Sequence, residues 1–198
     1  MTRMSRSVLF VSLILAVLVS VVAVAMPAGA ATPRPITPLQ ARHLIAANPC
    51  TAFRFGTVAR AFNGPHTVGP ITAVRVGRHS CFDRLVVDVT GGVPGWSVKY
   101  KDAFVQDASG RNLPFRGTKV MEVVLDTNAH NITTGRPTVT RASLPPRPNF
   151  PEFKDLIFGA DFEGQVQLGV GVNRVRPFRV FTLPGVRGHT LWILDVQH

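Results

Sequence analysis

From Cys50 to the C-terminus, apolar and polar residues alternate in short runs that Gly, Pro, Asn and Asp separate. Residues 84–90 show the pattern clearly, with Leu85, Val87 and Val89 on one face. A period of two, with turn residues between the runs, is typical of strands in an antiparallel sandwich or barrel. No window after residue 50 has a long apolar stripe at helical spacing. We therefore predict an all-β domain, an antiparallel β-sandwich of about nine strands.

The predicted strands share this alternation and the flanking turn residues. They lie at residues 51–60, 71–76, 84–90, 96–104, 119–126, 154–161, 165–172, 178–183 and 190–197. Residues 128–153 interrupt the series with five prolines, and proline cannot donate a hydrogen bond within a sheet. We expect this stretch to be a surface loop that joins two halves of the sheet system.

The first thirty residues have the three parts of a secretion signal. Arg3 and Arg6 are the only charges, residues 8–26 form an apolar run, and small residues follow. A signal peptidase reads these parts in this order, so we expect cleavage between Ala30 and Ala31. The apolar run also has about the 20 residues that a membrane-spanning helix needs, so an uncleaved anchor is the alternative.

Three regions follow from this reading. Residues 1–30 form the signal peptide, and residues 31–49, which open with three prolines in eight residues, form an extended linker. Residues 50–198 form the β-sandwich domain. Cleavage leaves 168 residues, which are enough for one domain with a real core.

The chain is strongly basic, with 22 Lys and Arg against 11 Asp and Glu and a formal net charge of +11. Because we expect export, nucleic acid is not the partner that this charge indicates. It favours acidic partners outside the cytoplasm, namely a cell-wall polymer (a teichoic-type polymer or the carboxylate-bearing stems of peptidoglycan) or anionic lipid head groups. A membrane is a partner only if the signal segment is retained. The alternative is that the charge serves only solubility.

Cys50 and Cys81 are the only cysteines. In an exported chain, two cysteines more often form one disulfide than a metal site or a free thiol pair. We therefore predict a structural Cys50–Cys81 bridge.

No catalytic motif is recognisable in the sequence. The six histidines lack metal-ligand spacing, and neither H-E-x-x-H nor G-x-S-x-G occurs. Asp161 and Glu163 permit the carboxylate pair of a glycosidase, but a turn over residues 161–164 explains them better. Gly169 and Gly171 fit close strand packing or a bulge better than a phosphate-binding loop. We expect no enzyme, no metal site and no cofactor.

Two connections between predicted strands, residues 75–84 and 174–179, concentrate arginine. Guanidinium groups make bidentate contacts with carboxylates and phosphates, so both connections are candidate ligand-binding surfaces. The alternative is that Asp83 pairs locally with Arg84 or Arg78 and that the other arginines are solvated. The candidate ligand-binding residues are Arg75, Arg78, His79, Arg84, Arg174, Arg176 and Arg179.

Three stretches of the chain resemble the AMIN-like domain, a family of secreted and lipid-anchored bacterial proteins related to the AMIN domain of cell-wall amidases. They are ITAVRVGRHSCFDRLVVDVTGGVPGWSVKY (residues 71–100), FEGQVQLGVGVNRVRPFRVFTL (162–183) and LWILDVQH (191–198). The resemblance covers residues 50–198, and the cysteine pair is similar to one found in a subset of that family. It implies a β-sandwich that holds or directs proteins at the cell envelope, and it implies no catalysis.

These observations predict a non-catalytic exported envelope module that binds peptidoglycan or an anionic glycopolymer. One alternative is a structural or partner-binding protein in which a sheet edge accepts a strand from another envelope protein. A secreted hydrolase is the weaker alternative, since it needs two convergent carboxylates in one cleft.

Overall fold

The structure is a computed structural model that describes residues 50, 54–66 and 69–198. All of these belong to one compact unit, residues 42–198. The predicted signal segment, its cleavage site between Ala30 and Ala31, and the linker all fall within residues 1–49, outside the described part. Within the described part, no helix is long and apolar enough to cross a membrane.

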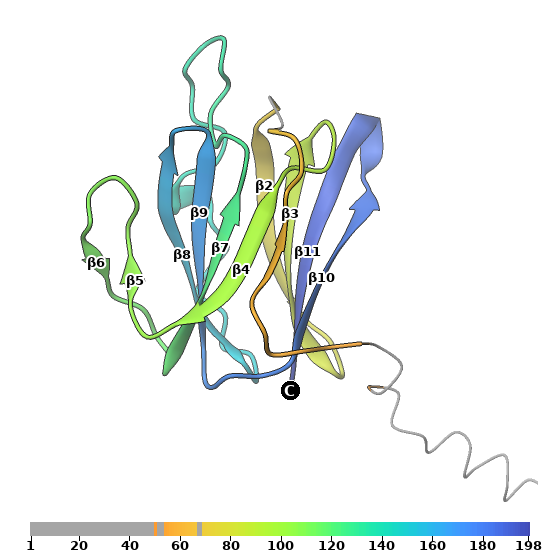
Figure 1. The fold of residues 1–198 in the computed structure, drawn as a ribbon, viewed down its shortest axis with the longest axis vertical. Coiled ribbons are helices and arrows are strands. Elements are labelled where there is room, and N and C mark those ends of the chain that lie inside the picture. Colours follow the sequence, from red (N-terminus) through yellow and green to blue (C-terminus); the bar gives the residue numbers. More distant parts are fainter. Residues whose placement is uncertain (1–49, 51–53, 67–68) are drawn as a thin grey trace, which may run out of the picture. The chain divides into compact units, whose positions relative to one another are not determined.

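Two antiparallel sheets face each other and form a β-sandwich, as predicted (Figure 1). The first sheet contains, in spatial order, β1 (Arg60–Phe62), β4 (Trp96–Lys101), β7 (Lys119–Leu125), β9 (Gln165–Val172) and β8 (Phe153–Phe162). The second contains β10 (Phe178–Pro184), β11 (His189–Gln197), β3 (Phe82–Thr90) and β2 (Ile71–Arg78). A small hairpin of β5 (Phe104–Val105) and β6 (Asn112–Leu113) and two short 3₁₀ helices, η2 (Arg141–Ser143) and η3 (Val186–Gly188), complete the described elements.

The core lies between the two sheets, where the alternating apolar residues meet. Leu85, Val87 and Val89 of β3 are fully buried, as the sequence pattern predicts. The rings of Trp96 in the first sheet and Trp192 in the second pack edge to face, with their centroids 6.0 Å apart. Because each fully buried large apolar side chain stabilises the fold by about 1.5–3 kcal/mol, this layer holds the two sheets together.

The β5–β6 hairpin covers the outer face of the first sheet. Phe104 packs on Val120 and Ile157, and its ring lies over two glycines of the sheet. A Cβ atom at Gly159 or Gly169 would lie only 2.9 Å from that ring. The interpretation of Gly169 as a close-packing residue is therefore confirmed, since any side chain there would displace the hairpin.

Residues 54–62 close one open side of the sandwich. Gly56 exchanges two backbone hydrogen bonds with Phe178 of β10, at 3.0 and 2.7 Å, and a few residues later β1 pairs with β4. The prediction of one continuous strand over residues 51–60 is wrong for its described part. This segment crosses from the second sheet to the first, so it pairs briefly with each instead of running along either one.

The proline-rich stretch between β7 and β8 lacks strands, as predicted, but it is not wholly a surface loop. Ala129 and Val139 are 1% and 4% exposed and belong to the core. Ile71 at the start of β2 donates its backbone N–H to the carbonyl of Asn128 and accepts a hydrogen bond from the Thr138 hydroxyl. The loop is therefore anchored to the edge of the second sheet.

Candidate functional site

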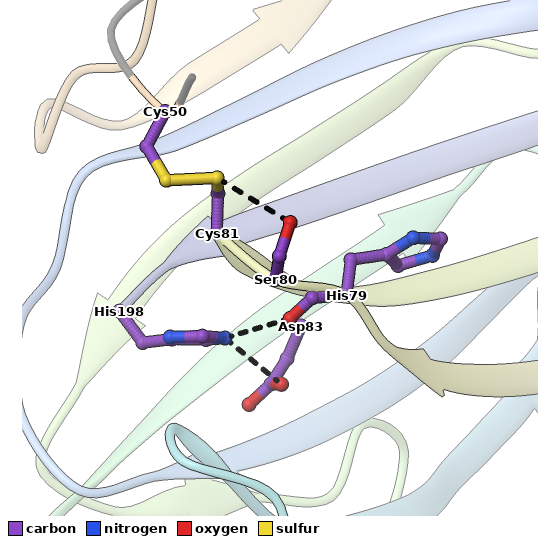
Figure 2. Close-up of a disulfide and its surroundings, with 6 residues drawn as sticks. All are labelled: Cys50, His79, Ser80, Cys81, Asp83 and His198. Atoms are coloured by element: carbon purple, nitrogen blue, oxygen red, sulfur yellow. Dashed lines mark hydrogen bonds and ion pairs between the residues drawn. A yellow bond between two sulfur atoms is a disulfide. The ribbon is translucent and has the colours of Figure 1, made fainter. Parts of the chain in front are cut away.

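The Cys50–Cys81 disulfide is present, which confirms the predicted pairing (Figure 2). Cys81 lies in the turn between β2 and β3, next to the candidate residue His79. The imidazole of His79 is exposed and stacks on Phe82, with 4.7 Å between the centroids. The bridge therefore ties Cys50, at the N-terminal end of the domain, to the first arginine-rich connection (residues 75–84).

The C-terminal residue lies against the same turn. The His198 ring nitrogen Nε2 lies 3.1 Å from the carbonyl oxygen of His79 and 3.8 Å from Oδ1 of Asp83 (Figure 2). Asp83 is fully buried, and its Oδ2 accepts the backbone N–H groups of Glu152 and Phe153 at 2.7 and 2.9 Å. The proposed local pairing of Asp83 with an arginine is therefore wrong, because this carboxylate points into the sandwich and fixes the start of β8.

Arg84 and Arg179, from the two separate arginine clusters, meet on one carboxylate. Asp195 of β11 is fully buried on the outer face of the second sheet. Arg84 reaches it with Nε and Nη2 at 2.6 and 2.9 Å, and Arg179 with Nε and Nη2 at 2.9 and 2.7 Å. Both guanidinium groups also lie over the ring of Phe181. These two arginines are only 22% and 17% exposed, so they serve mainly to build this face.

Arg174 and Arg176 meet on a second buried carboxylate. Their Nε atoms lie 3.3 and 3.0 Å from Oε1 of Glu152, which is 1% exposed. The Tyr100 hydroxyl donates to the carbonyl of Arg176 and accepts its backbone N–H. Burial, partly offset by the hydrogen bond to Arg176, raises the pKa of Tyr100 to about 12. Arg176 is therefore held at its backbone as well as at its side chain.

The remaining candidates are more exposed. Arg75 is 51% exposed and lies 3.7 Å from Asp88, which also pairs with His189 at 2.6 Å. Arg78 is exposed at the end of β2, beside His79. The structure thus brings most of the predicted residues to the end of the sandwich that carries the disulfide, while Arg75 lies further along β2.

A third cluster of the same design was missed by the sequence analysis. Lys99 and Lys101 of β4 pair with Glu122 of β7, at 3.0 and 2.7 Å. Burial alone would raise the pKa of Glu122, but the hydrogen bonds from Lys101 and Lys99 outweigh it, and the pKa is lowered. The alternation in WSVKYK places both lysines on one face, and this was the available signal. Three buried carboxylates thus each hold two cations, and each cluster keeps a net positive charge.

A cleft of about 700 Å³ beside β8 was also missed. It lies between β8, the β5–β6 hairpin and Arg141 of η2. Asp161 at its wall pairs with Nδ1 of His130 at 2.5 Å. Asp107 lines the same cleft, so two carboxylates do face it, but Asp161 is already held by His130. Sequence alone gave no signal for this cleft because the strands of its hairpin are two residues long.

The structure confirms the turn interpretation of residues 161–164. Glu163 and Gly164 have φ values of 49° and 76° and connect β8 to β9. Glu163 therefore lies in a tight turn beyond the end of β8. It does not share a strand face with Asp161, so the two do not form a carboxylate pair. Across the described ranges, no group of three His, Cys, Asp or Glu side chains could hold a metal ion.

Comparison with protein-family models finds a match to the AMIN-like domain over residues 69–198. The match begins just before β2 and extends through the last strand, so it includes both arginine-rich connections and every strand of the two sheets except β1. No curated protein matches the chain.

Proposed function

Because the chain belongs to the AMIN-like domain family, we propose that it is a non-catalytic cell-envelope module that binds an anionic cell-wall polymer, either peptidoglycan or an anionic glycopolymer. The family assignment and the Cys50–Cys81 disulfide both point to a location outside the cytoplasm. Domains of this family are typically cell-envelope modules that have no catalytic activity. Polymer binding is our addition, and it rests on how charge is distributed over the domain.

The observation that carries the proposal is the excess of cations around buried carboxylates. Glu122, Glu152 and Asp195 are at most 4% exposed, and each is bridged by two basic side chains. The carboxylates therefore lie inside while their cations reach the surface. Such a surface attracts polyanions and binds carboxylate or phosphate groups through charge-assisted hydrogen bonds.

The proposed contact residues divide into two groups. Arg75, Arg78, His79 and Arg174 are exposed and available to a polymer, and Arg174 is 64% exposed even though its Nε lies near Glu152. Arg84, Arg176 and Arg179 are less exposed and hold the surface in shape. Binding then depends on the first group, and folding depends more on the second.

The edges of the sheets favour a polymer over strand addition from a partner protein. Gly56 occupies the edge of β10 at Phe178, and β1 covers the edge of β4. The edge strands β2 and β8 both carry register shifts. Bulges of this kind twist an edge away from an incoming strand and interrupt its hydrogen-bonding row.

The test is retention of the exported protein on purified peptidoglycan sacculi, with and without their attached glycopolymers. We expect retention at low salt that weakens as ionic strength rises, because exposed charges are screened beyond about 10 Å at 0.1 M salt. The double variant Arg78→Gln/Arg174→Gln should lose most of the retention.

The matched control is Arg136→Gln/Arg187→Gln, which removes the same charge from two exposed arginines outside the clusters. Retention of this control at the wild-type level supports a specific surface. Equal loss in both double variants would reduce the effect to net charge alone. A wild-type protein that stays in the supernatant at low salt would end the polymer-binding proposal.

A further inference from the structure

A groove runs along β8, the edge strand of the first sheet. Three adjoining hollows of about 700, 320 and 200 Å³ line up along it and share Arg141. Together they are lined by every residue of β8 from Asp155 to Phe162. At a rise of about 3.3 Å per residue, these eight residues span roughly 25 Å. The groove is therefore long enough for several units of a chain molecule.

The wall opposite β8 is fixed in place by hydrogen bonds to the sheet. Gln106 donates its side-chain amide to the carbonyl of Gly159 at 2.6 Å. The side-chain amide of Gln167 accepts the backbone N–H of Asp107 at 3.1 Å and donates to the carbonyl of Val105 at 2.9 Å. Because these contacts hold the hairpin against the sheet, the groove is preorganised, which reduces the entropy lost on binding.

The lining combines apolar rings with planar polar groups. Phe158 and Phe162 form part of the wall, and Phe162 is 46% exposed. Side-chain amides and hydroxyls line the same space, among them Gln106, Ser109 and Asn112. Apolar surface with a few oriented polar groups is the usual composition of a site for an organic ligand. A sugar ring, with apolar C–H faces and polar hydroxyl edges, matches this alternation.

Arg141 gives the groove its charge preference. It is exposed, it lines all three hollows, and within the described residues no carboxylate pairs with it. Two of the neighbouring carboxylates are engaged, Asp161 with His130 and Asp155 with Arg147. Asp107 lines the hairpin side of the largest hollow, and a second arginine, Arg111, lines that side as well. An arginine in this position binds a carboxylate of the ligand through two parallel N–H bonds.

An extended peptide fits the groove less well. Strand addition needs a continuous row of free backbone groups, but β8 shifts register between Phe153 and Asp155 and again between Phe158 and Ala160. The Gly159 carbonyl is already taken by Gln106. The β8 edge therefore presents a ligand with side chains more than with free backbone groups, and this suits a saccharide better than a peptide strand.

We infer that the groove along β8 binds a short stretch of a carboxylate-bearing oligosaccharide, with Arg141 on the carboxylate and Phe162 against a sugar face. This rests on the proposed function, since it gives the bound polymer a second contact that recognises its sugar units. It is a site distinct from the arginine clusters, which sense only charge.

The experiment titrates the exported protein with trigalacturonate and, separately, with neutral chitotriose, and follows the heat of binding. We expect trigalacturonate to bind at least about fivefold more tightly than chitotriose. Arg141→Gln should weaken trigalacturonate binding about tenfold and remove this preference. Phe162→Ser should weaken both sugars. Products are analysed after the titration, and the sugars should remain intact.

Two variants away from the groove, one in β10 and one in the η3 turn that follows it, serve as controls. Arg187→Gln removes an exposed arginine, and Leu183→Ser replaces an apolar side chain that is 46% exposed, as Phe162 is. Both should bind trigalacturonate like the wild type, and unfolding midpoints verify that every variant is folded. Failure of the wild type to bind either sugar, or tighter binding of hexaglutamate than of trigalacturonate, overturns the inference. Equal binding of the two sugars overturns the role of Arg141.

Sacculus retention separates this inference from the proposed function. Loss of retention in Arg78→Gln/Arg174→Gln, without sugar binding in the wild type, leaves the envelope-binding proposal standing and removes the groove. Sugar binding without any retention on sacculi does the reverse.

Discussion

Asp195 accepts two hydrogen bonds from Arg84, at 2.6 and 2.9 Å, across 111 residues of sequence. The two residues are direct partners in the pairing of β3 with β11, and Arg179 is the partner of Asp195 on the other side. One buried carboxylate thus connects three neighbouring strands on the outer face of the second sheet. These hydrogen bonds form only when β3, β11 and β10 pair in this register. They therefore stabilise this register over shifted ones.

Asp195→Asn should destabilise the domain by about 3 kcal/mol, because it leaves two partly buried guanidinium groups without their anion. Urea unfolding followed by tryptophan fluorescence measures the loss. Asp102→Asn is the control, since Asp102 is 85% exposed in its pair with Lys119 and should cost less than about 1 kcal/mol. Similar losses in both variants would show that the burial of Asp195 is unimportant.

Gly169→Ala should destabilise the domain by about 1–3 kcal/mol, because the new methyl group would meet the Phe104 ring at 2.9 Å and push the hairpin off the sheet. Gly92→Ala has open space around the added Cβ and serves as the control. Thermal unfolding compares the two. A Gly169→Ala protein as stable as the control would mean that the hairpin moves freely.

Alkaline pH should weaken the fold through Tyr100. Its pKa is about 12 in the folded state against 10.0 when unperturbed, so the folded state keeps the phenol proton more tightly. This stabilisation is complete below pH 10 and is lost as the pH rises from 10 to 12, by about 1.4 kcal/mol per pH unit. Tyr100→Phe keeps the ring against Phe178 and should flatten the stability curve in this window. An unchanged slope in the variant would assign the loss to other groups.

Acid should weaken the fold through Glu122. Its pKa is lowered from 4.5, so its contribution is present above that pH and is lost as the pH falls through the folded-state value. Glu122→Gln should lower stability at pH 7 and remove this part of the acid dependence below about pH 4.5. Denaturant unfolding at a series of acidic pH values measures it. If stability fell with pH equally steeply in the variant and the wild type, the ion pairs of Lys99 and Lys101 with Glu122 would not contribute to the acid dependence.

Removing the disulfide with Cys50→Ser/Cys81→Ser should cost about 3–4 kcal/mol, because the bridge closes a loop over a separation of 31 residues. Hydrogen exchange should accelerate most at Gly56 and β1, which belong to the segment between Cys50 and β2. Denaturant unfolding gives the overall loss. Uniform acceleration across all strands would show that the bridge stabilises the domain as a whole and not this segment.

Local pattern was enough to predict much of the fold. The alternation at residues 84–90 identified the inward face of β3 because side chains in a strand must alternate. In β2 the simple alternation fails, since a register shift between Ile71 and Ala73 places both Ile71 and Val74 in the core. A bulge of one residue reverses every later face, and nothing in the local sequence marks it.

The candidate site depended more on long-range pairing. The sequence identified Arg84 and Arg179 as unusual, but their shared partner Asp195 follows from β3, β11 and β10 lying side by side. The groove along β8 depends on the position of a hairpin whose strands are too short to show alternation. Residues that meet only through tertiary structure leave no local pattern to read.

The bridge at Cys81 also sets how the domain bears tension. A pull on the chain ahead of Cys50, resisted at His198, passes through the sulfur–sulfur bond directly to the start of β3. The residues between the two cysteines, including β1 and β2, are then outside the path of the force. Under such a pull, the segment that closes the sandwich lies in parallel with the bridge and is not loaded first.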